Sequence, residues 1–120
     1  MAGILFIDDD PYTLETLTRA VELFNHQAIL ASSGEEALRL VAIEHPDLIF
    51  IDLMLPDIDG LQVLAQIREI GSAREIPIYL LSAANDRNIG EQARALGAQG
   101  YLTKPLRLQT LLDILQKYFA

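Results

Sequence analysis

Two short apolar runs without polar alternation limit most strongly what this chain can fold into, Ile4–Ile7 and Leu48–Ile51. A strand with one face in water alternates apolar and polar residues, so an unbroken apolar run indicates a central strand of a parallel sheet that helices cover on both faces. With three weaker runs, the sequence predicts strands at Gly3–Ile7, Gln27–Ala31, Leu48–Ile51, Ile76–Leu81 and Tyr101–Thr103.

The stretches between these runs change to a helical period. The stripe of a first helix, at steps of three and four, runs through Leu14, Leu17, Val21 and Phe24. Similar stripes predict four more helices. Their apolar positions are Leu38, Val41 and Ala42, then Leu61, Leu64 and Ile67, then Ile89, Ala93 and Leu96, and finally Leu108, Leu111, Leu112 and Leu115. Strands that alternate with helices predict one (βα)₅ domain over residues 1–120, with right-handed crossovers.

Composition excludes several functional classes. The chain has no cysteine, which rules out disulfides, thiolate zinc sites and cysteine nucleophiles. Nine basic against seventeen acidic residues give a net charge of −8, so a phosphate backbone would repel the domain and we expect no direct nucleic-acid binding. No apolar run approaches the ~18 residues of a membrane span, and the N-terminus does not resemble a secretory signal. We therefore expect a cytoplasmic protein without membrane contact.

Residues that carry chemistry follow the expected strands at the same end. Asp8 and Asp9 come after the first strand, Asp52 after the third, Ser82 after the fourth and Lys104 after the fifth. In open parallel sheets, ligands bind at the carboxyl ends of the strands, where the strand order reverses. We therefore expect these side chains to meet at one edge of the sheet.

Three carboxylates at one edge predict a bound cation. Close carboxylates repel one another, and the pKa of at least one rises unless a positive charge intervenes. Carboxylate and backbone oxygens are hard ligands that suit Mg²⁺. With Mg²⁺ bound, one carboxylate can stay ionised and attack a phosphoryl group to form an acyl phosphate. Lys104 and the hydroxyl of Ser82 could then offset charge on the transferred oxygens.

Four motifs support a closer identification. They are ILFIDDD, PDLIFIDLMLPDIDG, LSA and GYLTKP, at Ile4–Asp10, Pro46–Gly60, Leu81–Ala83 and Gly100–Pro105. In this order and spacing they resemble the receiver domain of two-component response regulators, such as the chemotaxis regulators, over essentially the whole chain. The resemblance implies a flavodoxin-like α/β fold, a three-layer sandwich whose five-stranded parallel sheet has the order 2-1-3-4-5.

The resemblance also implies roles in the acidic site. Asp52 matches the aspartate that accepts the phosphoryl group. Asp8 and Asp9 match the acidic pair that holds Mg²⁺ together with Asp52, and Met54 would lend a backbone carbonyl to the metal. Lys104 matches the lysine that pairs with the phosphoryl group.

A conformational switch is implied as well. Ser82 matches the switch hydroxyl and Tyr101 the switch aromatic, and their movement would bias the surface of the fourth helix, fifth strand and fifth helix. Pro105 matches a proline that follows a cis peptide. The implied phosphodonor is a histidine kinase or a phosphotransfer protein. The domain would not be an enzyme beyond Mg²⁺-dependent self-phosphorylation and slow self-dephosphorylation.

Other functions remain open at this point. A receiver-like interaction module can work without phosphorylation, although such modules usually have a damaged site and every matched position is present here. Asp8-x-Asp10 is similar to the start of the haloacid dehalogenase phosphatase motif, but Tyr12 stands where that motif has threonine. A flavin-binding protein of the same fold would place a phosphate where this chain has three aspartates, which would repel it.

Several other polar residues have a structural explanation. Asp10 is expected to cap the first helix, and Asp57 and Asp59 flank a turn, with Asp59 capping the third helix. His26 and His45 lie beside expected loops or strand starts, far from the acidic edge. We expect both histidines to face solvent.

Two neighbours of the site and the end of the chain bear on regulation and output. Met54 and Ala84 offer no amide or carboxylate to orient water, which predicts slow self-dephosphorylation. Gln99 and Gly100 stand where DNA-binding relatives often have acids, so a DNA-binding output gains no support. Because the chain ends about one helix after Pro105, we expect it to hold no effector domain.

Overall fold

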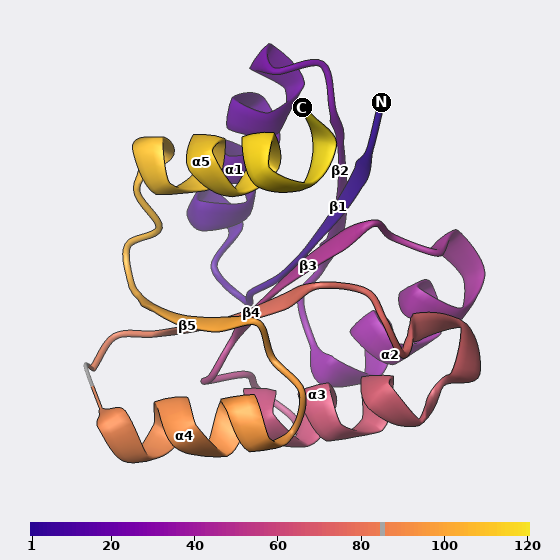
Figure 1. Ribbon diagram of the computed structural model, residues 1–120, viewed down its shortest axis with the longest axis vertical. Coiled ribbons are helices and arrows are strands. Elements are labelled where there is room, and N and C mark those ends of the chain that lie inside the picture. Colours follow the sequence, from indigo (N-terminus) through magenta and orange to yellow (C-terminus); the bar gives the residue numbers. More distant parts are fainter. Residues whose placement is uncertain (85) are drawn as a thin grey trace.

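The computed structural model describes residues 1–84 and 86–120 and contains alternating strands and helices (Figure 1). The strands are β1 (Gly3–Ile7), β2 (Gln27–Ala31), β3 (Leu48–Asp52), β4 (Ile78–Ser82) and β5 (Gly100–Thr103). The helices are α1 (Pro11–Leu23), α2 (Gly34–Glu44), α3 (Gly60–Glu69), α4 (Arg87–Ala95) and α5 (Leu108–Phe119), with a short 3₁₀ turn η1 at Gly71–Ala73.

The five strands form one parallel sheet in the order β2-β1-β3-β4-β5, which confirms the predicted flavodoxin-like topology. The register pairs Ile7 with Ala31 on one side and with Ile51 on the other, so β1 lies between β2 and β3. The strand order reverses at this point, because β2 and β3 follow β1 in sequence but lie on opposite sides of it. The acidic ends of β1 and β3 are therefore direct neighbours.

Helices cover both faces of the sheet, as the unbroken apolar strands predict. Figure 1 shows α1 and α5 on one face and α2, α3 and α4 on the other. Alternate residues of each central strand serve the two sides: Ile4 and Phe6 pack with α1 and α5, whereas Leu5 and Ile7 pack with α2 and α3. The rings of Phe6 and Phe50 stack across β1 and β3 with centroids 5.4 Å apart. Burial on both faces makes these strands the rigid base of the site at their ends.

Helix starts follow the predicted caps. Asp10 accepts a hydrogen bond from the backbone N–H of Tyr12 at the start of α1. Asp59 accepts one from the N–H of Gln62, whose side chain returns a bond to the N–H of Asp59, so α3 begins with a complete capping box. Both caps sit directly after loops that leave the carboxyl ends of strands.

Element ends differ from the sequence-based prediction by a residue or two. Strand β4 begins at Ile78 because Pro77, which precedes it, has no N–H to donate to a ladder. Phe24 lies one residue beyond α1 but still packs, half-buried, on the α1–α5 side of the sheet. The weakly apolar stretch predicted as the fourth helix folds as α4, with buried contacts at Gly90 and Ala93.

The expectation that both histidines face solvent is wrong for His26. Its Nδ1 accepts a hydrogen bond of 3.1 Å from the backbone N–H of Ala2, and its ring lies 5.5 Å from that of Phe119. His26 therefore ties the start of β1 to the end of α5. His45 is exposed and ends α2 with a left-handed φ of 49°.

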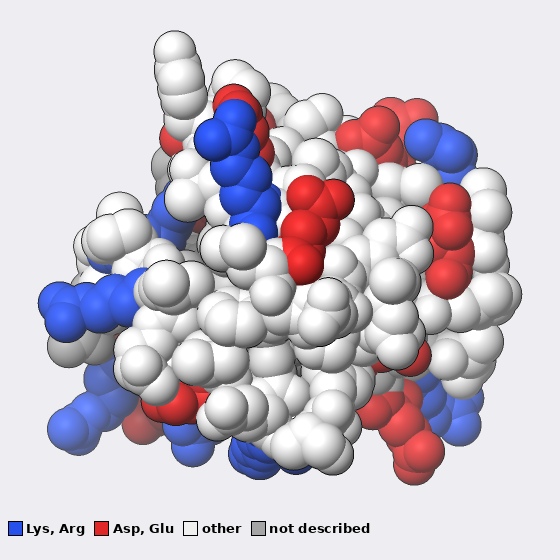
Figure 2. All heavy atoms as spheres, turned by 90° about the horizontal axis from the view of Figure 1, so that it is seen from above, with Lys and Arg blue, Asp and Glu red and all other residues white. Residues whose placement is uncertain are grey.

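Within the described ranges, no helix has the length and apolar character that crossing a membrane would require. The surface seen in Figure 2, which looks onto α1 and α5, is largely uncharged in its middle.

Candidate functional site

The ends of β1, β3 and β4 place three polar side chains in the interior of the carboxyl edge. Asp8, Asp52 and Ser82 are 2%, 5% and 5% exposed, and they are the buried polar side chains among the described residues. Asp9, next to Asp8, is exposed. Carboxylate oxygens of Asp8, Asp9 and Asp52 all lie within 4.8 Å of one another. The structure thus brings together the three acids that the sequence pattern predicted at one edge.

Lys104 joins this cluster from the end of β5. Its Nζ donates hydrogen bonds to Oδ2 of Asp8 at 3.0 Å and to Oδ2 of Asp52 at 3.1 Å. The backbone N–H of Lys104 donates to the carbonyl of Ser82, which fixes the end of β5 beside β4. The Lys104–Pro105 peptide bond is cis. One ammonium group therefore faces two buried carboxylates.

Opposing effects set the charge states of this cluster. Burial raises the pKa of Asp52, and the nearby charge of Asp8 raises it further, so the hydrogen bond and positive charge of Lys104 do not bring the pKa down to its ordinary value. Burial alone would lower the pKa of Lys104, but its hydrogen bonds to Asp8 and Asp52 and their negative charges outweigh that effect and raise it. Lys104 therefore stays charged, while its surroundings destabilise the ionised form of Asp52 relative to the protonated form.

Backbone groups hold the other oxygens of the two buried carboxylates. Asp8 Oδ1 accepts a bond of 2.9 Å from the N–H of Asp10, and Asp52 Oδ1 accepts one of 3.3 Å from the N–H of Met54. The side chain of Met54 is 74% exposed and lies at the rim of the cluster. Each carboxylate is thus oriented by the first residues of the loop that follows it.

Gly60 packs against the backbone of Asp52 and Leu53, a role that the motif pattern did not reveal. A Cβ on Gly60 would lie 2.5 Å from the backbone oxygen of Asp52 and 2.9 Å from the Cα of Leu53. The N–H of Gly60 donates to the carbonyl of Leu53. The absence of a side chain lets the start of α3 pack directly on the end of β3.

Asp57, which the sequence suggested as a turn residue only, caps a different helix. Its two oxygens accept bonds of 2.9 Å from the N–H groups of Gly34 and Glu35 at the start of α2. These backbone bonds hold the pKa of Asp57 below its ordinary value. The loop after Asp52 is thereby anchored to α2. No sequence signal could have found this contact, because Gly34 and Asp57 are far apart along the chain.

Ser82 and Tyr101 both contact the segment after β4. Ser82 Oγ accepts a bond of 3.3 Å from the N–H of Ala84. The hydroxyl of Tyr101 donates to the carbonyl of Ala84 and accepts a bond of 3.0 Å from the N–H of Asp86. The Tyr101 ring packs on Gly90, where a Cβ would meet it at 3.1 Å. Tyr101 therefore links β5 to the segment that leads from the site to α4.

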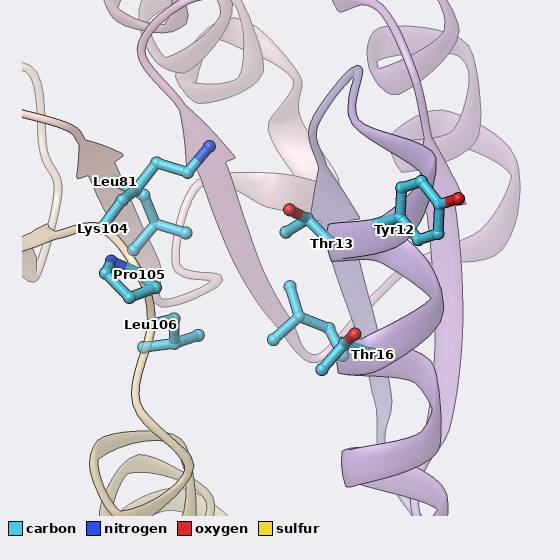
Figure 3. A pocket seen from close by; sticks show the side chains of 8 residues that line it. Tyr12, Thr13, Thr16, Leu81, Lys104, Pro105 and Leu106 are labelled. Atoms are coloured by element: carbon cyan, nitrogen blue, oxygen red, sulfur yellow. The ribbon is translucent and has the colours of Figure 1, made fainter.

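A groove runs alongside the cluster between α1 and the segment that follows β5. It has a volume of about 270 Å³, and Figure 3 shows it between the first turns of α1 and the side chains that follow β5. Its lining is mostly apolar, and Tyr12 at its rim is 79% exposed. Lys104 lines the groove and also donates hydrogen bonds to Asp8 and Asp52, so it links the groove to the acidic cluster.

The donors present fit Mg²⁺ chemically. Three ionisable carboxylates within 4.8 Å of one another offer hard oxygen ligands, and one of them, Asp9, is exposed to solvent. Mg²⁺ usually keeps several waters and binds through one or two carboxylates, which suits a cluster open on one side. Neither cysteine nor histidine, the ligands that softer metals prefer, is present in the cluster.

Comparison with known proteins relates this geometry to a family. The model of the response regulator receiver domain matches residues 4–116. Protein PilH of Pseudomonas aeruginosa is 30% identical over 120 residues, which cover 100% of this chain and 99% of that protein. The response regulator MprA of Mycolicibacterium vanbaalenii is 39% identical over 111 residues, 91% of this chain and 46% of MprA. The chain thus spans less than half of the length of MprA.

Solved structures agree in fold. The chemotaxis protein CheY4 of Vibrio cholerae superposes with a TM-score of 0.92 at 26% identity, over 99% of each chain. The receiver domain of the sensor histidine kinase PA1611 of Pseudomonas aeruginosa, solved with a magnesium ion coordinated in its active site cleft, gives 0.87 at 27% identity, over 98% of this chain and 96% of that one. With the family model matching nearly its whole length, this chain belongs to the response regulator receiver domains of two-component systems.

Proposed function

We propose that this domain is a phosphoacceptor switch, in which Asp52 accepts a phosphoryl group from a histidine kinase or a phosphotransfer protein in a Mg²⁺-dependent reaction. The observation that carries the proposal is one constellation: the buried Asp52 carboxylate, the Lys104 Nζ at 3.1 Å, and the Asp8 and Asp9 carboxylates within 4.8 Å. Asp8, Asp9 and Asp52, with the carbonyl of Met54, would hold Mg²⁺. When bound, the ion would neutralise charge on the phosphoryl oxygens.

The reaction assigned to Asp52 is a phosphoryl transfer. A carboxylate oxygen of Asp52 attacks phosphorus and forms an acyl phosphate, while the phosphorus–nitrogen bond of the donor histidine breaks and its electron pair stays on the imidazole nitrogen. Burial raises the pKa of Asp52, which makes its ionised carboxylate oxygen a stronger nucleophile, and Lys104 and Mg²⁺ would offset the charge on the phosphoryl group that it receives. Lys104 then moves its hydrogen bond to a phosphoryl oxygen.

The response to phosphorylation begins at Ser82. A phosphoryl group adds strong acceptor oxygens and negative charge beside its hydroxyl. If Ser82 Oγ turns to donate to a phosphoryl oxygen, it gives up the bond from the N–H of Ala84, and the segment after β4 is free to shift. Tyr101 holds the same segment through Ala84 and Asp86, so the shift reaches β5 and α4. Apart from its own phosphorylation and dephosphorylation, the domain would act on no other molecule.

Intact mass spectrometry after incubation with acetyl phosphate tests the proposal. We expect a gain of one phosphoryl group that requires Mg²⁺ and is absent in Asp52→Asn. Beryllofluoride, which mimics the phosphoryl group, should shift the amide NMR signals of Ser82, Ala84 and Tyr101 in the same protein. No mass gain together with no beryllofluoride response, in a folded protein, would show that the domain works without phosphorylation.

A further inference from the structure

The loop between β3 and α3, residues 53–59, carries the backbone groups of Met54 that the proposed Mg²⁺ site would use. It follows Asp52 directly, and the N–H of Met54 donates to Oδ1 of Asp52 at 3.3 Å. At the far end of the loop the N–H of Gly60 donates to the carbonyl of Leu53 at 2.8 Å, which closes the loop on itself. The position of the residues between these bonds depends on further contacts.

The carboxylate of Asp57 supplies such a contact in the middle of the loop, and it joins the loop to a helix distant in sequence. Oδ1 accepts a hydrogen bond from the N–H of Gly34 and Oδ2 accepts one from the N–H of Glu35, each at 2.9 Å. These are the first two residues of α2, whose N–H groups have no partner within a helix. The backbone bonds hold the pKa of Asp57 below its ordinary value, so the carboxylate is ionised and accepts both bonds at neutral pH.

Apolar packing brings the loop and α2 together at the same place. A Cβ on Gly34 would lie 2.6 Å from Cγ1 of Ile58 and 2.8 Å from Cγ2 of Val63. Ile58 is half-buried against the core on the side of the sheet that α2 and α3 cover (Figure 1). A side chain at position 34 would therefore press the loop away from α2 and stretch the two bonds to Asp57.

The segment between Asp57 and Met54 is short and stiff. Asp57 lies three residues after Met54. Pro56 has a fixed φ and restricts the residue before it, Leu55, to extended conformations. Leu55 is also half-buried against the core. A displacement of Asp57 is therefore passed on to Met54 rather than absorbed between them.

We propose that Asp57 is a positioning residue for the phosphoacceptor site, which holds the loop against α2 and thereby keeps the Met54 N–H on Asp52 and the Met54 carbonyl in place for Mg²⁺. The inference deepens the proposed function, on which it rests for the Mg²⁺ site. Asp57 is not among the acids whose oxygens lie within 4.8 Å of one another, Asp8, Asp9 and Asp52, so its effect passes through the backbone of the loop. Groups that orient metal ligands from outside commonly change metal affinity tenfold or more when they are removed.

The stability of α2 is the alternative explanation for any effect of Asp57, because its two bonds also cap that helix. A second cap separates the two explanations. Ser33, the residue before α2, accepts a hydrogen bond of 3.1 Å from the N–H of Glu36 through its Oγ, and this bond stays within the start of the helix. Ser33→Ala therefore weakens α2 without opening its contact with the loop, which makes it the matched control.

Amide hydrogen exchange and calorimetric titration of Mg²⁺, both on the whole chain, test the inference. In the metal-free protein, Asp57→Ala should speed exchange of the Met54 N–H about fivefold. The same variant should raise the Kd for Mg²⁺ roughly tenfold. Gly34→Ala presses on the loop from α2 while Asp57 is intact, and it should change both quantities in the same direction. Ser33→Ala should lower the melting temperature about as much as Asp57→Ala and leave both quantities near their wild-type values.

Two outcomes would overturn the inference. One is a Met54 exchange rate or a Mg²⁺ Kd that Asp57→Ala leaves unchanged, and the other is an equal change in Ser33→Ala, which would assign the effect to helix stability. The proposed function is judged separately. A wild-type protein that binds no Mg²⁺ and gains no phosphoryl group from acetyl phosphate would refute that function, whereas the exchange of the Met54 N–H, measured without metal, would still decide whether Asp57 positions the loop.

Discussion

At the scale of single residues, the site is built on one buried carboxylate in surroundings that disfavour its charge. Asp52 accepts bonds from Lys104 Nζ and from the N–H of Met54, yet burial and the charge of Asp8 still raise its pKa. Folding thus costs free energy when Asp52 is ionised. The same surroundings favour reactivity, because a carboxylate whose charge was fully stabilised would be a weaker nucleophile toward phosphorus.

Asp52→Asn should therefore stabilise the fold in the absence of Mg²⁺. Because the pKa of Asp52 is raised in the folded state, the wild-type protein loses stability as the pH rises from the unfolded pKa, about 3.9, through the folded pKa. We expect the variant to gain roughly 1 kcal/mol in free energy of unfolding at neutral pH. The gain should vanish as the pH falls to about 4, where Asp52 is protonated in the wild type. Urea unfolding in EDTA across this range measures it, with Glu75→Gln as an exposed control. Equal stability at neutral pH would contradict the assigned strain.

Ala84 controls a second property at this scale, the lifetime of the proposed acyl phosphate. Its side chain is exposed beside Ser82 and offers no group to hold a water. Ala84→Gln should place an amide there and speed loss of the phosphoryl group roughly tenfold by orienting the attacking water. The decay of the phosphorylated mass over time measures the rate. Ala95→Gln makes the same change on α4 and should leave the rate as it is; an unchanged rate in Ala84→Gln would remove water positioning as the cause.

At the scale of elements, close packing between α3 and β3 holds the phosphoacceptor in place. Gly60 is the first residue of α3, and its Cα faces the backbone of Asp52 and Leu53. The two nearest atoms that a Cβ would meet are backbone atoms of the central strand and of the residue after it, which cannot move aside, and the third is Cδ1 of Leu80 at 3.0 Å. The helix start and the site therefore cannot be altered independently.

Gly60→Ala should accordingly destabilise the protein by about 3 kcal/mol through overpacking against backbone atoms. Gly71→Ala is the matched control, because nothing lies within 4 Å of the Cβ that it would add. We expect the control to stay within about 0.5 kcal/mol of the wild type. Thermal and urea unfolding of both variants compare them directly. Similar losses in the two variants would show that chain entropy, not the contact with β3, sets the cost.

At the scale of the whole molecule, the sequence predicted the sheet and the acidic cluster well because both depend on strong local patterns. Unbroken apolar strands indicate a parallel sheet with two covered faces, and this pattern places the acids after Ile7 and Ile51 at the same edge of the sheet. The strand order that makes β1 and β3 neighbours came from the family resemblance and not from the local pattern. The pattern failed where a contact joins distant segments with ordinary residues. The sequence suggests Asp57 as a turn residue, but in the fold it caps α2 through the N–H of Gly34. It suggests His26 as a solvent-facing loop residue, but in the fold His26 accepts a hydrogen bond from Ala2 and its ring contacts that of Phe119.

The predicted Mg²⁺ site depends on the whole fold, because its carboxylates follow two different strands, β1 and β3, and come together only in the folded protein. A ligand that binds only the folded state raises the free energy of unfolding, by about 2.7 kcal/mol at a hundred times its Kd. We expect Mg²⁺ to raise the melting temperature of the wild type by several degrees. Asp9→Asn should remove most of this rise while changing the metal-free melting temperature little, because Asp9 is exposed whereas Asp8 and Asp52 are buried. Glu75→Gln, which removes an exposed acid elsewhere, should respond to Mg²⁺ like the wild type. An equal rise in Asp9→Asn would assign the ion to other ligands, and calorimetric titration of Mg²⁺ into both variants would then decide whether Asp8 and Asp52 suffice.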